Sequence, residues 1–379
     1  MLLFCFSYNA LHPRLHIWIS LTPEREPLLK SILIPFSFIF AFAVGCSTVK
    51  HMPGPFPGDS EKSSDYTVIT YIHGDSDYLF HDKDGRAVQA DENALIKIRR
   101  SAQRARNGEY IIFHQQQQKK LLWIFPRRNS KIYHYKNGQL VNQLSYRIGS
   151  ESESFLETES KIFRDLTLFE SGPANRLFFL FFGHEIPLFP GDTYHRSHPD
   201  IEVHTESFSE GIQQFIPKGD RFDLVALSTC NNGTPAMIHH LRGVSDIVLA
   251  SPQNLHLSHL DTGQFSLLET EPGLSSRELA EAVAENTFDR LTDTVQTAIT
   301  LSVYDSEHLR SYISDLHVQA DNFIEQETPN LYRDNVDCSK LPFFDSKEFK
   351  SGVVTLFRPA AFGRDAGDSE HSGWGCKGI

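Results

Sequence analysis

Two short apolar runs, each followed by polar residues, stand out in the hydrophobic pattern of the chain. Leu177–Phe182 and Leu224–Leu227 have the length and composition of buried strands. The first run leads into Gly183-His184-Glu185 and the second into Ser228-Thr229-Cys230. Open α/β sheets place their ligands beyond the carboxyl ends of their strands. If the two strands are neighbours in a parallel sheet, His184 and Cys230 therefore lie at the same edge.

Helix signals alternate with the apolar runs. Thr234 is a suitable N-cap for a helix that begins at Pro235, and Ser275 with Glu278 forms a capping-box pattern. The alternation predicts an α/β fold with a mostly parallel central sheet covered by helices on both faces. The expected strands are 67–72, 110–114, 121–125, 131–135, 177–182, 224–227 and 247–250. The expected helices are 88–106, 154–169, 208–216, 235–242, 275–290 and 305–323.

The N-terminal segment has a pattern of its own. An apolar run over 31–45 is too short for a confident membrane span but has the length of a signal-peptide core. It ends in Ala-Val-Gly followed by Cys46, which resembles a bacterial lipobox with Cys46 as the lipidated residue. An ordinary signal peptide or an uncleaved anchor is the alternative. We therefore expect a signal peptide over 1–45, a flexible tether over 46–65, a folded domain over 66–325 and a partly disordered extension over 326–379.

Composition narrows the class of function. The chain has 379 residues and a formal net charge of −12, which argues against general nucleic-acid binding. Five cysteines are too few for a disulfide scaffold. With Cys46 lipidated, Cys338 and Cys376 are available to pair with each other, which leaves Cys230 outside any disulfide. We expect no cofactor and no metal: the pair His256 and His259 has no carboxylate pattern around it, so a substrate loop is the better interpretation.

The position of Cys230 suits nucleophilic chemistry. A thiol becomes a strong nucleophile when a base removes its proton, and imidazole is the usual base. His184 occupies the corresponding position after the earlier strand. Taken singly, a cysteine after a strand is more often a small buried hydrophobe and a histidine more often an ordinary polar residue. Their joint placement at strand ends favours a catalytic pair.

The segment FDLVALSTCNNGTPAM, which contains Cys230, resembles the catalytic-cysteine segment of clostripain-like cysteine peptidases, of the caspase-fold clan. Tyr66–Asp77 resembles the first strand and Gly-Asp-x-Asp turn of that family, Val248–Ser251 a later strand, and Thr300–Asp305 a late strand-to-helix segment. The resemblance extends over roughly residues 66–323. It implies a caspase-like three-layer sandwich, and it implies that His184 and Cys230 form the dyad of a cysteine endopeptidase.

The resemblance also implies the rest of the site. Backbone N–H groups of Cys230 and Glu185 would bind the oxyanion, and Ser228 and Ser251 would lie beside the substrate. Two positions depart from the family pattern: Glu185 replaces the usual glycine after the histidine, and Ser228 replaces the aspartate of members that cleave after Arg or Lys. The expected partners are a peptide or protein substrate and, through the lipid anchor, a membrane of the bacterial cell envelope. The alternative is a catalytically inactive caspase-fold lipoprotein that binds peptide or acts as an envelope protein.

Overall fold

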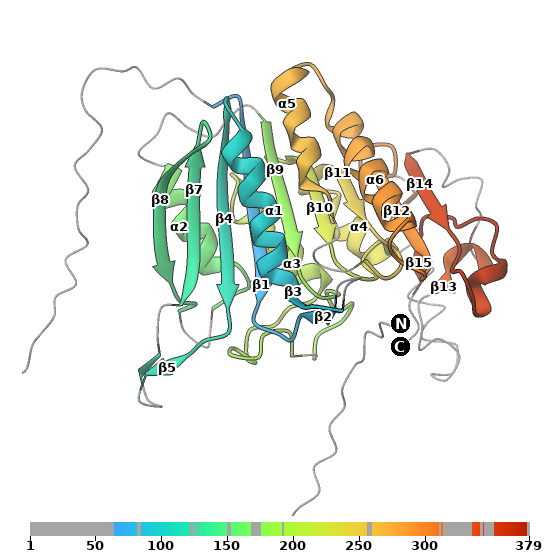
Figure 1. Cartoon of the computed structure of the whole chain (residues 1–379), viewed down its shortest axis with the longest axis horizontal. Helices are drawn as coiled ribbons and strands as arrows, with labels where there is room; N and C mark the ends of the chain where they lie inside the picture. Colours follow the sequence, from blue (N-terminus) through green and yellow to red (C-terminus); the bar gives the residue numbers. More distant parts are fainter. Residues whose placement is uncertain are drawn as a thin grey trace, which may run out of the picture. The chain divides into compact units, whose positions relative to one another are not determined.

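A nine-stranded mixed sheet forms the centre of the molecule (Figure 1). Its strand order is β14-β12-β11-β10-β9-β1-β4-β7-β8, and the five strands from β11 to β4 run parallel. The pairs β12/β14 and β7/β8 flank them in antiparallel orientation. These strands are β1 (Tyr66–Gly74), β4 (Gly108–Gln116), β7 (Ser130–Lys136), β8 (Gln139–Tyr146), β9 (Arg176–Phe182), β10 (Phe222–Ser228), β11 (Ser245–Ala250), β12 (Ile299–Asp305) and β14 (Val353–Arg358).

The computed structural model describes residues 64–81, 85–121, 125–126, 129–149, 153–167, 176–191, 193–255, 260–310, 312–313, 336–341, 344 and 352–376. All of them belong to one compact unit, Glu61–Ile379. Small two-stranded sheets pair β2 (Leu79–His81) with β3 (Ala87–Gln89), β5 (Lys120–Leu121) with β6 (Phe125–Pro126), and β13 (Val336–Asp337) with β15 (Gly375–Cys376). The predicted signal peptide, Cys46, most of the tether, His256 and His259 lie outside the described residues.

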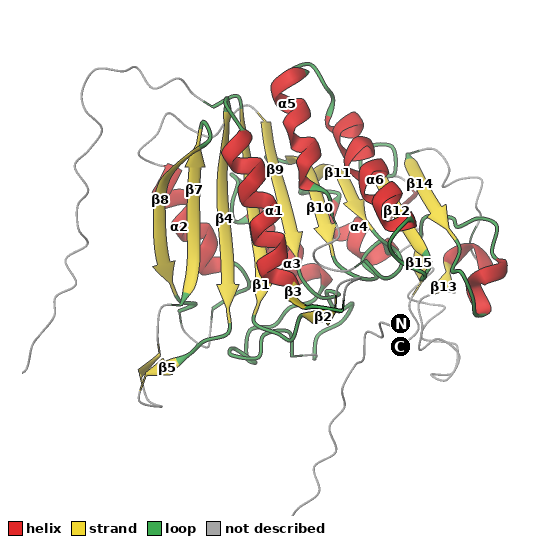
Figure 2. Ribbon diagram, viewed as in Figure 1, coloured by secondary structure: helices red, strands yellow, loops and turns green. Residues whose placement is uncertain are grey.

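Helices cover both faces of the main sheet, as Figure 2 shows. One face buries apolar residues of α1, α5 and α6 against the sheet, and the other buries those of α2, α3 and α4. The expected three-layer α/β architecture is therefore confirmed. The helices are α1 (Ala90–Arg104), α2 (Glu157–Thr167), α3 (Thr205–Gln213), α4 (Pro235–Leu241), α5 (Leu267–Thr270) and α6 (Ser276–Thr292), with 3₁₀ turns at Thr262–Ser266, Cys338–Lys340 and Arg364–Gly367.

Local sequence signals account for several element boundaries. The side chain of Thr234 accepts a hydrogen bond from the Met237 N–H, with Pro235 at the first position of α4. Ser275 and Glu278 form the expected capping box at the start of α6. Asn137 and Gly138 both have positive φ angles, as a type I′ hairpin between β7 and β8 requires.

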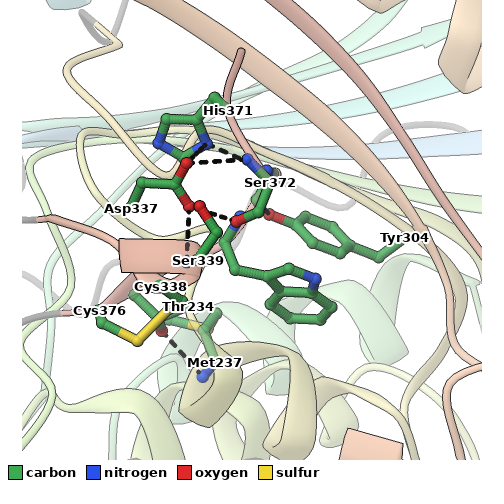
Figure 3. The surroundings of a disulfide bond; sticks show 11 residues. Thr234, Met237, Tyr304, Asp337, Cys338, Ser339, His371, Ser372 and Cys376 are labelled. Carbon is green, nitrogen blue, oxygen red and sulfur yellow. Dashed lines mark hydrogen bonds and ion pairs between the residues drawn. A yellow bond between two sulfur atoms is a disulfide. The ribbon is translucent and has the colours of Figure 1, made fainter. Parts of the chain in front are cut away.

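The C-terminal region takes part in the fold more than its sequence indicates. We expected an extension after residue 325, but β14 forms an edge strand of the main sheet, antiparallel to β12. Cys338 and Cys376 form a disulfide, as anticipated, and Cys230 takes part in none. The bond lies beside Thr234 and Met237 at the start of α4 (Figure 3). Trp374 is fully buried against the ring of Tyr304, 4.7 Å between centroids.

A backbone hydrogen bond connects this C-terminal segment to the loop that follows β10. The Gly375 N–H donates to the Gly233 carbonyl at 2.8 Å. Tyr304 supports the same contact, since its hydroxyl donates to the Gly373 carbonyl. The disulfide therefore holds a segment that packs directly beneath the Cys230 loop. Within the described part of the chain, no helix is long and apolar enough to span a bilayer.

Candidate active site

The strands β9 and β10 bring the two candidate residues to one edge of the sheet. They pair in parallel with Phe182 opposite Ser228, and the Gly183 N–H extends the ladder by donating to the Ser228 carbonyl at 3.3 Å. His184 and Cys230 each follow their strand by the same two residues. The register therefore places both residues just beyond the carboxyl ends of neighbouring parallel strands, where the sequence predicted a site.

The turn after Cys230 depends on the particular residues that form it. Asn231 has a φ of 56°, a left-handed conformation that asparagine tolerates better than most residues. A β-carbon on Gly233 would lie 2.5 Å from the Tyr304 hydroxyl and 2.6 Å from the Pro252 nitrogen, so only glycine fits there. The chain can then turn sharply from β10 into the Thr234 cap of α4.

Two asparagines bind the Cys230 turn to the His184 turn. The Asn232 side chain accepts from the Ile186 N–H and donates to the Ile186 carbonyl, both at 3.0 Å. The Asn231 amide donates to the Glu185 carboxylate at 2.7 Å. Because Asn232 and Ile186 are almost fully buried, water does not compete for these bonds. The bridges fix the two turns relative to each other beyond the last strand pair.

His184 is held by two tyrosines. The Tyr78 ring stacks on the imidazole, with 4.1 Å between centroids and 27° between planes. The Tyr78 hydroxyl accepts from the His184 N–H at 3.2 Å, and Tyr194 donates to the His184 carbonyl at 3.1 Å. His184 as a whole residue is exposed. Desolvation by the surrounding protein nevertheless lowers its pKa to about 4, while Asp77 acts to raise the pKa and Arg196 to lower it. A neutral imidazole at neutral pH can accept a proton.

Cys230 is buried, with 8% of its surface exposed. Its thiol lies 3.5 Å from the Leu255 carbonyl, to which it can donate a weak hydrogen bond. Tyr194 lies near both candidate residues: it bonds the His184 carbonyl, and its pKa is raised by burial first and then by the nearby Cys230 and Glu185. A β-carbon on Gly183 would lie 2.6 Å from the Tyr194 hydroxyl, so the glycine before His184 makes room for this tyrosine.

The two predicted serines are buried beneath this edge. Ser228 is 0% exposed, and its hydroxyl accepts from the Leu260 N–H at 3.3 Å. Ser251 is 1% exposed and closes a turn with Gln253, donating to its carbonyl and accepting from its N–H. Direct contact of either hydroxyl with a substrate stays a prediction.

Sequence reasoning did not identify the tyrosines that hold His184. Tyr78 follows the Gly-Asp-x-Asp turn that the sequence did single out, and Tyr194 lies in the loop after β9. Nothing in the local sequence pattern marks either tyrosine, because each contacts His184 from a separate part of the chain or across a loop. The Asn231-Asn232 pair was visible next to Cys230, but its partners in the other turn were not.

One group of described residues offers a possible set of metal ligands. Asp91, Glu92 and His114 present ligand atoms within 4.8 Å of one another. His114 already bonds the Asp91 carboxylate at 3.0 Å, and Glu92 is exposed. This arrangement is explained by an ordinary buried histidine–carboxylate pair, so we assign it no metal.

The fold of this chain is similar to that of solved clostripain-like, or C11, cysteine proteases. The resemblance seen in the sequence is thus confirmed at the level of the fold. At the level of sequence, no protein-family model and no curated protein matches the chain.

Three solved structures share this fold. A zymogen C11 protease from Parabacteroides distasonis, described as inactive, has a TM-score of 0.55 at 14% identity, over 83% of this chain and 92% of its own. The secreted C11 protease "iotapain" from Bacteroides thetaiotaomicron has a TM-score of 0.56 at 12% identity, over 83% and 94%. A secreted C11 protease from the same organism, in complex with an irreversible peptide inhibitor, has a TM-score of 0.54 at 13% identity, over 83% and 89%.

The Asn232 bridge gives a prediction for stability. Asn232→Leu keeps the branched shape of the side chain but leaves the buried N–H and carbonyl of Ile186 without these partners. Each loss costs about 1–3 kcal/mol, so we expect the free energy of unfolding to fall by at least about 2 kcal/mol in a urea titration. Asn286→Leu, at an exposed position of α6, is the matched control and should stay within about 0.5 kcal/mol. Wild-type stability in Asn232→Leu would show that the bridge does not tie the two turns together.

Proposed function

We propose that the protein is a cysteine endopeptidase in which His184 and Cys230 form the catalytic dyad. The observation that carries the proposal is the register of β9 and β10, which sets both residues at equal positions beyond neighbouring parallel strands. The Asn232 bridge maintains that arrangement beyond the strands. The shared fold with C11 proteases supports the same assignment.

The chemistry follows from these two groups. Neutral His184 removes the proton from the Cys230 thiol as the sulfur attacks the peptide carbonyl. The carbonyl oxygen becomes an oxyanion, which we assign to the backbone N–H groups of Cys230 and Glu185. The protonated imidazole then gives its proton to the leaving amine, and a thioester remains on Cys230. Water, deprotonated by His184, hydrolyses the thioester and restores the thiol.

The peptide substrate is supported by a structural relative. The Bacteroides thetaiotaomicron protease was crystallised with an irreversible peptide inhibitor, and its fold is shared here. We therefore assign an extended peptide to the sheet edge at His184 and Cys230. Glu185, which replaces a family glycine, directs its carboxylate toward the Asn231 amide. That contact gives the glutamate a defined place in the site.

The first prediction tests the dyad by kinetics. Because nucleophile and base act as a unit, Cys230→Ala and His184→Ala should each lower kcat/KM for peptide hydrolysis by at least about a thousandfold. His308→Ala is the control. The His308 side chain is 62% exposed and follows β12 at the opposite edge of the sheet, so this substitution should leave kcat/KM unchanged. Hydrolysis that survives Cys230→Ala would end the assignment of Cys230 as the nucleophile of a cysteine peptidase. A folded wild-type protein that hydrolyses no peptide would favour the non-catalytic, peptide-binding lipoprotein.

The second prediction concerns the residue at the cleaved bond. Ser228 supplies no negative charge where family members that cut after Arg or Lys carry an aspartate. Asp246 cannot replace it, because it lies at the start of β11 and pairs with Arg221 at 3.0 Å. A charge-assisted contact is worth about 1.5–3 kcal/mol. Without it, the preference for Arg or Lys over other residues at the cleaved bond should be lower by about tenfold or more. A peptide-library profile should show no strong preference for Arg or Lys. A profile with cleavage only after those residues would contradict this and point to another acid, such as Asp261.

The third prediction concerns location. We propose that Cys46 is lipidated and tethers the domain to a membrane of the bacterial envelope. Two of the solved structures with this fold are described as secreted proteases, which fits a site of action outside the cytoplasm. Cys46→Ala should abolish lipid attachment and release the protein from the membrane fraction. Intact-mass analysis and fractionation provide the measurement. Unchanged membrane association in this variant, together with a wild-type mass that lacks lipid, would rule the anchor out.

A further inference from the structure

A buried chain of aromatic residues leads away from His184 into the core, and the mechanism above does not use it. Its first member, Tyr78, is 4% exposed and lies in the turn between β1 and β2. It contacts His184 twice: its ring stacks on the imidazole, and its hydroxyl accepts the backbone N–H. One side chain therefore constrains both the ring plane and the backbone position of the proposed base.

The hydroxyl of Tyr78 is fixed in turn by two histidines. It lies 2.6 Å from Nδ1 of His73, and Nε2 of His73 lies 3.2 Å from Nδ1 of His195. Both histidines are almost completely buried, at 0% and 1% exposure. Burial, foremost, lowers the pKa of His73 well below its usual value and that of His195 to about 3, so both rings are neutral.

The hydrogen atoms shared by the Tyr78, His73 and His195 side chains can be assigned. Burial raises the pKa of Tyr78 well above its usual value, so the phenol keeps its hydrogen, for which His73 Nδ1 is the acceptor. His73 then carries its own hydrogen on Nε2 and donates to His195 Nδ1. The last donor, Nε2 of His195, has no hydrogen-bond partner among the described residues. A buried polar group without a partner destabilises the folded state, so these hydrogen-bonded residues are not the most stable way to fill this part of the core.

We propose that Tyr78 is a positioning residue for His184, and that His73 and His195 hold Tyr78 in the orientation this requires. The inference rests on the proposed function, because it concerns the same imidazole. The stacked ring restricts rotation of the imidazole and excludes water from one of its faces. The hydroxyl prevents the His184 backbone from drifting along the sheet edge. Small displacements of a catalytic group are costly: about 1 Å can lower a rate about a hundredfold.

Charged residues near His184 also shift its pKa, so they must stay unchanged if a pKa shift is to report on Tyr78. Asp77, from the same turn as Tyr78, raises the pKa of the imidazole, and Arg196, from the loop after Tyr194, lowers it. Among the described residues, further titratable groups face this region from several elements: Cys230, Glu185, Tyr194, His195, His73, Asp75, Tyr78 and Asp91. Removing the Tyr78 ring changes none of these charges and admits water to the imidazole. A shift in the pKa of His184 after that change therefore reports lost stacking.

The experiment compares Tyr78→Leu, which removes ring and hydroxyl, with Tyr78→Phe, which removes the hydroxyl alone. Tyr135→Phe is the matched control: that tyrosine is also buried and hydrogen-bonded, to Arg99 at 2.8 Å, but on the outer strand β7. The first readout is the NMR titration of the His184 imidazole, assigned with His184→Asn. The second is kcat and KM for a peptide substrate across pH.

In Tyr78→Leu we expect the pKa of His184 to rise toward the ordinary histidine value of about 6.5. The acid limb of the kcat/KM profile should move up with it, and kcat should fall about a hundredfold with KM nearly unchanged. In Tyr78→Phe the pKa of His184 should stay close to wild type, while kcat falls by a smaller factor, about tenfold. Tyr135→Phe should match wild type in both readouts.

A folded Tyr78→Leu with wild-type His184 titration and wild-type kcat would overturn the proposal. If that variant does not fold, Tyr78→Phe decides, because it keeps the volume of the ring, and a wild-type kcat in it would overturn the proposal equally. The titration does not depend on turnover. A wild-type protein without peptidase activity would therefore refute the proposed function, while the shift in Tyr78→Leu would still test the positioning of His184.

Discussion

The parallel pairing of β9 with β10 is the constraint on which the candidate site depends. Side chains alternate along strands, so a slip of one residue would turn Cys230 or His184 away from its partner. The apolar residues of both strands are buried on both faces, which makes such a slip costly. Asn232 then continues the register where strand hydrogen bonds end, by bonding both backbone groups of Ile186. Hydrophobic burial sets the position of the two residues, and one buried amide preserves it.

Much of the fold was predictable because its signals are local. The apolar runs before His184 and Cys230, the caps at Thr234 and Ser275 and the hairpin at Asn137 each act within a few residues of their own position. The edge strand β14 was not predictable in this way. Its side chains are only partly buried, and its pairing partner β12 lies about fifty residues earlier in the sequence, so no strong local alternation marks it.

In the candidate site too, the residues with a local sequence signal were predictable and those that act through distant contacts were not. A cysteine and a histidine after apolar runs can be recognised singly, and the fold supplies their proximity. Tyr78 and Tyr194 could not be recognised, because each holds His184 through contacts made only when separate loops meet. The buried histidines behind Tyr78 extend this arrangement into the core. On the other side, the disulfide at Cys376 secures the segment beneath the Cys230 turn. The site is thus held from both flanks by residues distant in sequence.

The most direct test of the account is covalent labelling of the thiol. A short peptide that carries a thiol-reactive group at its carboxyl end is incubated with the purified protein at neutral pH, and the modified residue is mapped by mass spectrometry. The account predicts a single adduct on Cys230, formed much more slowly when His184 is replaced by alanine. An unmodified Cys230 in folded wild-type protein, or equal labelling rates in the two proteins, would contradict it.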